Sequence, residues 1–113
     1  MSRLLRRADD FLGNFDHQYR WYLFEAGEAV ARRYLDAMWR ALEELAAHPG
    51  LGRLRHFRHP ALHGLRSFRV RPPFEVHLIF YRYNDQELSV ERLMSGRRDL
   101  ARRLREPPGS ATD

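Results

Sequence analysis

The fold is decided by residues 8–47, which read ADDFLGNFDHQYRWYLFEAGEAVARRYLDAMWRALEELAA. In the first half of this stretch, aromatic and aliphatic side chains recur every three or four residues, at Phe11, Phe15, Tyr19, Tyr22 and Ala26. This spacing places them on one face and predicts an amphipathic helix from about Ala8 to Ala26. Gly27 then ends the helix or forms a tight corner.

A second helix is predicted from about Glu28 to Ala47. Its apolar positions share one stripe: Val30, Tyr34, Ala37, Met38, Ala41 and Leu45. Its other side carries charges that alternate in sign every four residues, as on a solvated helix surface. Pro49 and Gly50 stop the helix. Because little more than Gly27 separates the two helices, they are expected to fold back as an antiparallel hairpin.

After a loop at residues 51–64, the spacing of the apolar residues changes to every second position. Alternating apolar residues predict three strands, at about 66–70, 76–81 and 88–94. The turn Asn84-Asp85 pairs the second with the third, and residues 3–7 are expected to add a strand at the sheet edge. A short helix follows from Arg97 to Arg105. The prediction is therefore an α+β fold: a helical hairpin on a small antiparallel sheet, with residues 1–106 as one domain and 107–113 as a flexible tail.

The charge of the chain is concentrated in its second half. The 113 residues carry a net charge of +5, and all 20 basic residues are arginine. Residues 51–105 hold 13 arginines against 5 acidic residues, so an anionic partner is expected on this part of the fold. A coding bias toward arginine is the plainer explanation of the missing lysine. Without cysteine, a signal segment or an apolar run of membrane length, the sequence predicts a soluble cytoplasmic protein that does not enter membranes.

No constellation of residues indicates a cofactor or a metal. His56, His59 and His63 have a spacing that suggests zinc, but Pro60 lies among them and several arginines nearby would repel a dication. Adjacent carboxylates within the helices point about 100° apart and cannot share a proton. A phosphate-binding loop and a catalytic triad are not recognisable either. We therefore expect no metal, no cofactor and no catalytic residue.

Arginine and aromatic side chains are the better candidates for a functional surface. The arginines lie on or just after the predicted strands, where a guanidinium at a sheet margin pairs well with carboxylate or phosphate: Arg66, Arg69, Arg82, Arg92, Arg97 and Arg98. Solvated surface charge is the alternative interpretation. Trp21 and Trp39 lie outside the apolar stripes of their helices. They are either half-buried packing residues or aromatic anchors for a partner.

Five segments in order resemble the ParE branch of the RelE/ParE toxin superfamily. They are YLFEAGEAVARRYLDAM at 22–38, AAHPGLGR at 46–53, HGLRSFRV at 63–70, HLIFYR at 77–82 and VERLMSGRRDL at 90–100. The resemblance covers nearly the whole chain. It implies a helical hairpin on a curved antiparallel sheet, in agreement with the periodicity.

The resemblance also implies a toxin of a type II toxin–antitoxin system. A ParD-like antitoxin with an acidic C-terminal segment would bind the hairpin in a hetero-oligomer, at Tyr19, Trp21, Tyr22, Tyr34 and Trp39. The six arginines would contact DNA gyrase, which ParE toxins trap on DNA as inhibitors and not as enzymes. The alternatives are a ribosome-dependent messenger RNA endonuclease of the RelE type and a non-toxic antitoxin-binding module. Many relatives carry histidine where Ser95 precedes Gly96, and its absence counts against the nuclease.

Overall fold

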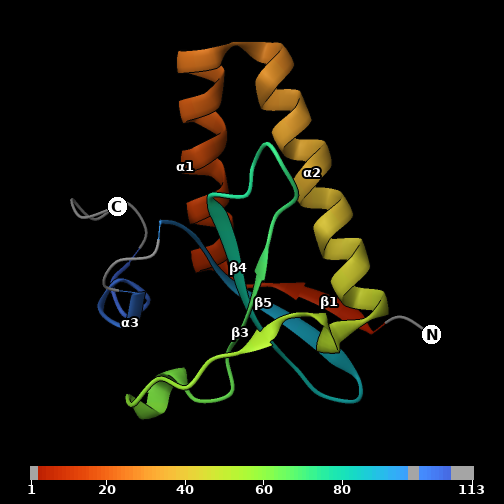
Figure 1. The fold of residues 1–113 in the computed structure, drawn as a ribbon, viewed down its shortest axis with the longest axis vertical. Helices are drawn as coiled ribbons and strands as arrows, with labels where there is room; N and C mark the ends of the chain where they lie inside the picture. The colour runs from red at the N-terminus through yellow and green to blue at the C-terminus, as the bar shows by residue number, and fades with distance from the viewer. Residues whose placement is uncertain (1–2, 97–99, 108–113) are drawn as a thin grey trace.

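Two long helices form a hairpin that stands on one side of a sheet (Figure 1). The computed structural model describes residues 3–96 and 100–107. Helix α1 spans Asp9–Ala26 and α2 spans Glu28–Ala47, which confirms both predicted helices. Gly27 adopts a φ of 93° and its N–H donates to the carbonyl of Tyr22. Glycine suits this corner because a positive φ costs it no Cβ clash.

The sheet has five strands in the order β1-β5-β4-β3-β2. Their bounds are β1 Leu4–Arg7, β2 Arg53–Leu54, β3 Arg66–Arg69, β4 His77–Tyr83 and β5 Glu87–Ser95. The three strands predicted from alternation are confirmed, and so is the edge strand near the N-terminus. The loop expected at 51–64 contains the short strand β2 and the 3-10 turn η2 (Pro60–Leu62), and another 3-10 turn, η1 (Pro49–Leu51), ends at its first residue.

One expectation about the sheet was wrong: the sheet is mixed, because β1 runs parallel to β5 while the other pairs are antiparallel. A parallel pair needs a long crossover between its strands. Here the helical hairpin and three further strands lie between β1 and β5 in sequence, which local periodicity could not reveal.

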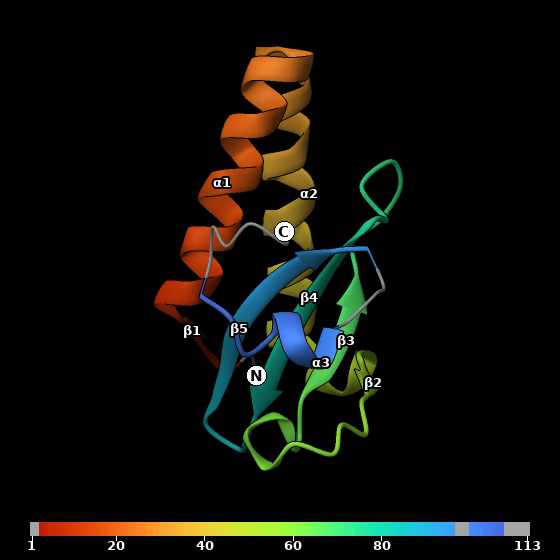
Figure 2. The same cartoon turned by 90° about the vertical axis from the view of Figure 1, so that its left-hand side faces the viewer.

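Each face of the sheet is covered by its own apolar cluster. The hairpin face buries Tyr34, Leu45, Ile79 and Tyr81 together with residues of β5. The opposite face is covered by the segment around η2 and by the short helix α3 (Leu100–Arg103), which confirms a C-terminal helix (Figure 2). Residues 97–99 and 108–113 lie outside the described residues, so the predicted start of this helix and most of the predicted tail stay predictions.

A bulge in β5 sets the direction of its side chains. Phe80 pairs with Arg92, but Tyr81 pairs with Val90, so Glu91 is the extra residue. Such a bulge reverses the alternation downstream of it. Val90 and Leu93 therefore both join the core under the hairpin.

Candidate functional site

An aromatic cluster joins the hairpin to the sheet. The ring of Tyr22 on α1 lies 5.0 Å from that of Tyr34 and 5.4 Å from that of Phe74. Its hydroxyl is 2.8 Å from Nε2 of His77, the first residue of β4. Burial raises the pKa of Tyr22, so its hydroxyl stays protonated. The cluster holds α1 against the end of β4 by a hydrogen bond as well as by packing.

His77 is a buried neutral imidazole. The residue is 2% exposed, and burial lowers its pKa from 6.5 to about 4. A charged imidazolium would lose its hydration in this position, which is why the neutral form is favoured. His77 pairs with Ser95 across the β4–β5 ladder. The structure thus places an imidazole beside Ser95 at the end of β5.

A pocket of about 360 Å³ opens over this region, between α1 and the ends of β4 and β5. Trp21 forms one wall and is 52% exposed. Arg103 is mostly buried and donates to the carbonyl of Ser95 at 2.8 Å. The pocket therefore combines an aromatic wall with polar groups. Its lining is Asn14, His17, Gln18, Trp21, Tyr22, Val76, His77, Leu93, Met94, Ser95 and Arg103.

A second groove, of about 280 Å³, lies between α1 and α2. It is the more apolar of the two, with Arg7 and Asp36 as its charged residues. Trp39 borders it and is 53% exposed. Its apolar lining is Phe11, Leu12, Phe15, Leu35, Met38, Trp39 and Leu42. An exposed tryptophan beside an apolar groove is the arrangement expected of a protein-binding site.

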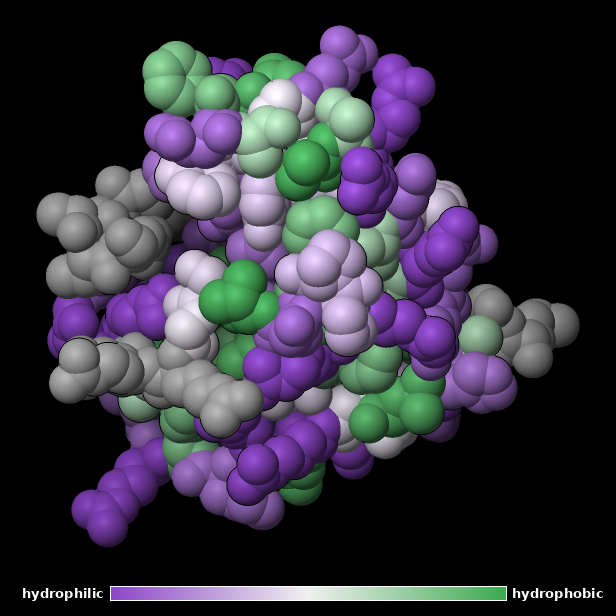
Figure 3. Space-filling view, turned by 45° about the horizontal axis from the view of Figure 1, so that its top comes forward, coloured by the Kyte–Doolittle hydropathy of each residue, from purple (hydrophilic) through white to green (hydrophobic). Residues whose placement is uncertain are grey.

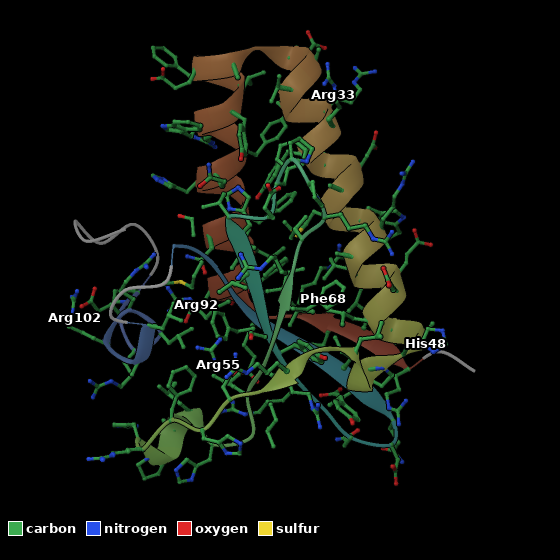
Figure 4. All side chains as sticks on the ribbon, viewed as in Figure 1. Arg33, His48, Arg55, Phe68, Arg92 and Arg102 are labelled. Atoms are coloured by element: carbon green, nitrogen blue, oxygen red, sulfur yellow. The ribbon has the colours of Figure 1, made fainter. Side chains whose placement is uncertain are left out.

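The predicted arginine surface is divided by the fold. Arg92 is 5% exposed, which corrects its assignment to the surface. Its Nε donates to Oδ1 of Asn14 at 2.8 Å, and its Nη1 donates to the carbonyls of Leu104 and Glu106. Figure 4 shows it on the α3 side of β5. The bulge at Glu91 turns it there, and it ties α1 to the C-terminal segment.

The other described arginines differ in what they contact. Arg82 forms an ion pair with Glu91 at 2.7 Å and donates to two carbonyls near η2, so it fastens that segment. Arg66 is half-buried and donates to the carbonyl of Gly52 at 2.9 Å. Arg69 is exposed and donates to the carbonyl of Glu75. Arg97 and Arg98 lie outside the described residues.

The predicted aromatic surface is divided as well. Tyr34 is fully buried, as its place in the apolar stripe of α2 predicts, and this corrects its assignment to the antitoxin-binding surface. Tyr19 and Tyr22 are partly buried against the same core. Trp21 and Trp39 are exposed, but they border different pockets, so they do not form one site.

Comparisons with known proteins identify the family. A family model described as the ParE toxin of the type II toxin–antitoxin system parDE matches residues 5–100. The chain belongs to the ParE toxin family. Toxin ParE3 of Caulobacter vibrioides is 33% identical over 104 residues, which cover 92% of this chain and 96% of the relative. The chain is thus a ParE-type toxin of a type II toxin–antitoxin system.

Solved structures agree on the fold. A chain of the chromosomal ParDE system from P. aeruginosa superposes with a TM-score of 0.68 at 16% identity, covering 85% of this chain and 98% of that chain. A mutant of the E. coli toxin RelE in the free state gives a TM-score of 0.54 at 14% identity, covering 96% and 95%. At such identities the likeness concerns the fold alone.

Sequence reasoning named Arg66 but missed three further arginines of this ParE-type toxin, Arg3, Arg53 and Arg55. The guanidinium groups of Arg3 and Arg66 lie 5.2 and 5.5 Å from the ring centre of Tyr83. Burial, and then the nearby charge of Arg53, lower the pKa of Arg55. Charged and apolar residues alternate at Arg53, Leu54 and Arg55, as in a strand. However, β2 itself is only two residues long, which is too short to be recognised from alternation.

Two expected absences can be compared with the described residues. Within 3–96 and 100–107, no three potential ligands gather to hold a metal ion. His59 instead accepts a hydrogen bond from the N–H of Ala61, and a ring nitrogen of His63 lies 3.2 Å from the carbonyl of Arg58. Among the same residues, no helix has the length and apolar character to cross a membrane.

Proposed function

We propose that this ParE-type toxin acts by binding, inhibits DNA gyrase and so blocks replication, and is neutralised by a tightly bound antitoxin. The family resemblance supplies the target. The antitoxin is supported by the ParDE system of P. aeruginosa, whose toxin shares the fold. Both partners act inside the cell, so a cytoplasmic location is part of the proposal.

The observation that carries the proposal is that His77, the imidazole beside the end of β5, is buried and neutral. The resemblance implies that many relatives carry histidine at the position of Ser95, and His77 beside it is buried. A general base for attack by a ribose hydroxyl works best with a pKa near the operating pH. With a pKa of about 4, the imidazole of His77 is a weak base at neutral pH. The site therefore favours binding over catalysis.

The apolar groove between the helices supports antitoxin binding. Trp39 offers a large aromatic surface at its rim, and Met38 and Leu42 supply an apolar floor. Figure 3 shows hydrophobic patches between hydrophilic residues on the hairpin side of the molecule. An amphipathic helix binds a groove of this kind through its apolar face. The net charge of +5 favours an acidic partner.

One observation favours the RelE-type nuclease as a second candidate. The pocket at the end of β5 contains His77 and Arg103, an imidazole and a cation that the sequence did not place together. The two candidates differ in their target, so one pair of assays separates them.

Purified toxin at micromolar concentration is added to gyrase with plasmid DNA, and separately to ribosomes translating a defined message. We expect supercoiling to fall and cleavage complexes to rise, with the message left intact. Arg69→Ala should weaken the effect on gyrase, whereas Arg20→Ala is a matched control that removes the same charge from the exposed side of α1. Cut message with unchanged gyrase would establish the nuclease. Normal growth after induction would instead favour a non-toxic antitoxin-binding module.

A further inference from the structure

Residues 45–74 carry basic residues and no acidic one. This stretch holds six arginines and four histidines, with neither aspartate nor glutamate. Its arginines are Arg53, Arg55, Arg58, Arg66, Arg69 and Arg71. In the fold the stretch includes β2, η2 and β3, so these cations gather at one margin of the sheet. Arginine clustered on one part of a surface is the electrostatic feature of proteins that bind nucleic acid.

The centre of this stretch, residues 53–63, forms an anchored basic projection. The chain leaves the sheet after β2, turns at η2 and returns as β3 (Figure 1). Leu62 is buried in the apolar cluster that covers this face of the sheet. Arg82 donates to the carbonyls of Ala61 and His63, and an ion pair fixes the position of its guanidinium. The backbone of the basic projection is therefore held in place, and its side chains need no folding step when a ligand binds.

Three arginines of the basic projection form no ion pair within residues 3–96 and 100–107: Arg53, Arg55 and Arg58. Arg53 and Arg58 are exposed, and Arg55 is half-buried. Burial, and then the charge of Arg53, lower the pKa of Arg55, so two like charges are held close together. An anion that contacts both would relieve this repulsion. Asp10 and Glu91 share a pocket with other residues of the projection, but none of the three arginines lines it.

The spacing of Arg53 and Arg55 suits the backbone of a nucleic acid. Arg53 pairs with Ser67 in the β2–β3 ladder, and Nη1 of Arg55 donates to Oγ of Ser67 at 3.2 Å. Both side chains therefore lie on the side of the sheet that Ser67 faces. Residues two apart in a strand are separated by about 6.6 Å. Because a DNA strand advances about 3.4 Å along its axis per phosphate, two such guanidinium groups reach neighbouring phosphates of one strand.

The basic projection lacks the surfaces that a peptide or an unpaired base would need. A peptide that folds on binding gains affinity by burying apolar surface. Leu54 is the large exposed apolar residue here, but it pairs with Arg66 and so faces the other side of the sheet. Unpaired bases stack on exposed aromatic rings, whereas Phe57 is partly buried and has the guanidinium of Arg55 over its ring at 5.6 Å. Exposed cations without either surface suit the phosphates of a base-paired duplex.

We propose that Arg53, Arg55 and Arg58 bind the phosphate backbone of double-stranded DNA without reading its sequence. Contacts to phosphate position a protein on a duplex and carry no sequence information of their own. The toxin alone has this property. With gyrase present, the same contact places the toxin on the DNA that the enzyme holds, and this second step rests on the proposed function.

Fluorescence anisotropy tests the contact, with purified toxin and a labelled duplex of arbitrary sequence in the absence of gyrase. Each phosphate that an arginine neutralises releases counter-ions, so the affinity depends on salt. With three such contacts, we expect the affinity to fall about 40-fold between about 50 and 200 mM salt. A fall of less than about threefold over this range, or no binding at its lower end, would overturn the proposal.

Three double variants separate the projection from the overall charge. Arg53→Gln with Arg58→Gln removes two exposed cations, so the fall in affinity over the same salt range should shrink to about fourfold. Arg53→Lys with Arg58→Lys keeps both charges and should keep the steep salt dependence. Arg20→Gln with Arg32→Gln is the matched control, because it removes two exposed arginines of the hairpin and gives the same net charge. Equal losses in the two glutamine variants would refute the placement of the site.

Gyrase trapping by the same toxin distinguishes this inference from the proposed function. Toxin that traps gyrase but binds no duplex refutes the DNA contact alone. Toxin that binds the duplex through Arg53 and Arg58 but leaves gyrase unaffected refutes the toxin mechanism and supports the DNA contact. Tighter binding of a single-stranded RNA of the same length would refute the duplex as the ligand and indicate RNA instead.

Discussion

Acid should destabilise this protein through His77. The residue is buried and its pKa falls from 6.5 to about 4 on folding. Because the folded state favours the neutral ring, the stabilisation is complete above pH 6.5 and is lost as pH falls toward 4. At about 1.4 kcal/mol per pKa unit, the full loss is about 3 kcal/mol, of which about 2 kcal/mol disappears between pH 7 and pH 5.

The assay is urea unfolding of the wild type and of His77→Gln at pH 7 and pH 5. Glutamine does not titrate and can still hydrogen-bond the hydroxyl of Tyr22, so the variant keeps the polar contact and removes the proton. Carboxylates that titrate in this range contribute equally to both proteins and cancel in the comparison. We expect the wild type to lose about 2 kcal/mol more than the variant over this interval. Equal losses would show that His77 is not the buried neutral group inferred from the structure.

Three further results are expected. Arg92→Ala should lower the free energy of unfolding by about 2–4 kcal/mol, because it removes a buried cation that bonds to Asn14, Leu104 and Glu106, whereas Arg69→Ala should change it by less than about 0.5 kcal/mol; similar values in denaturant unfolding would contradict their placement. Gly52→Ala should be strongly destabilising, since its Cβ would lie 2.3 Å from the hydroxyl oxygen of Tyr81, and an unchanged melting temperature would be inconsistent with that contact. Trp39→Ala should weaken binding of the proposed antitoxin by about 2 kcal/mol or more, and Trp21→Ala should weaken it much less; if calorimetry gives the reverse order, the antitoxin binds at the pocket beside β5 instead.

Local pattern predicted the elements well and the site only in part. The stripes of the helices and the alternation of the strands recur at fixed spacing, so the hairpin and the strands β3 to β5 followed from neighbouring residues. The exposure of the arginine side chains was harder to predict. Arg69 and Arg92 look alike in sequence, since both stand among apolar strand residues. One is exposed at an edge and the other is enclosed between α1 and the C-terminal segment.

The chain by itself determined an α+β protein with a helical hairpin, a turn at Gly27 and a basic second half, because periodicity, glycine conformation and charge depend on nearby residues alone. The tertiary structure decided the parallel pairing of β1 with β5, the burial of Arg92 and Tyr34, and the exposure of Arg69. These depend on contacts between residues far apart in sequence. A single extra residue, Glu91, is enough to redirect every side chain that follows it in the strand.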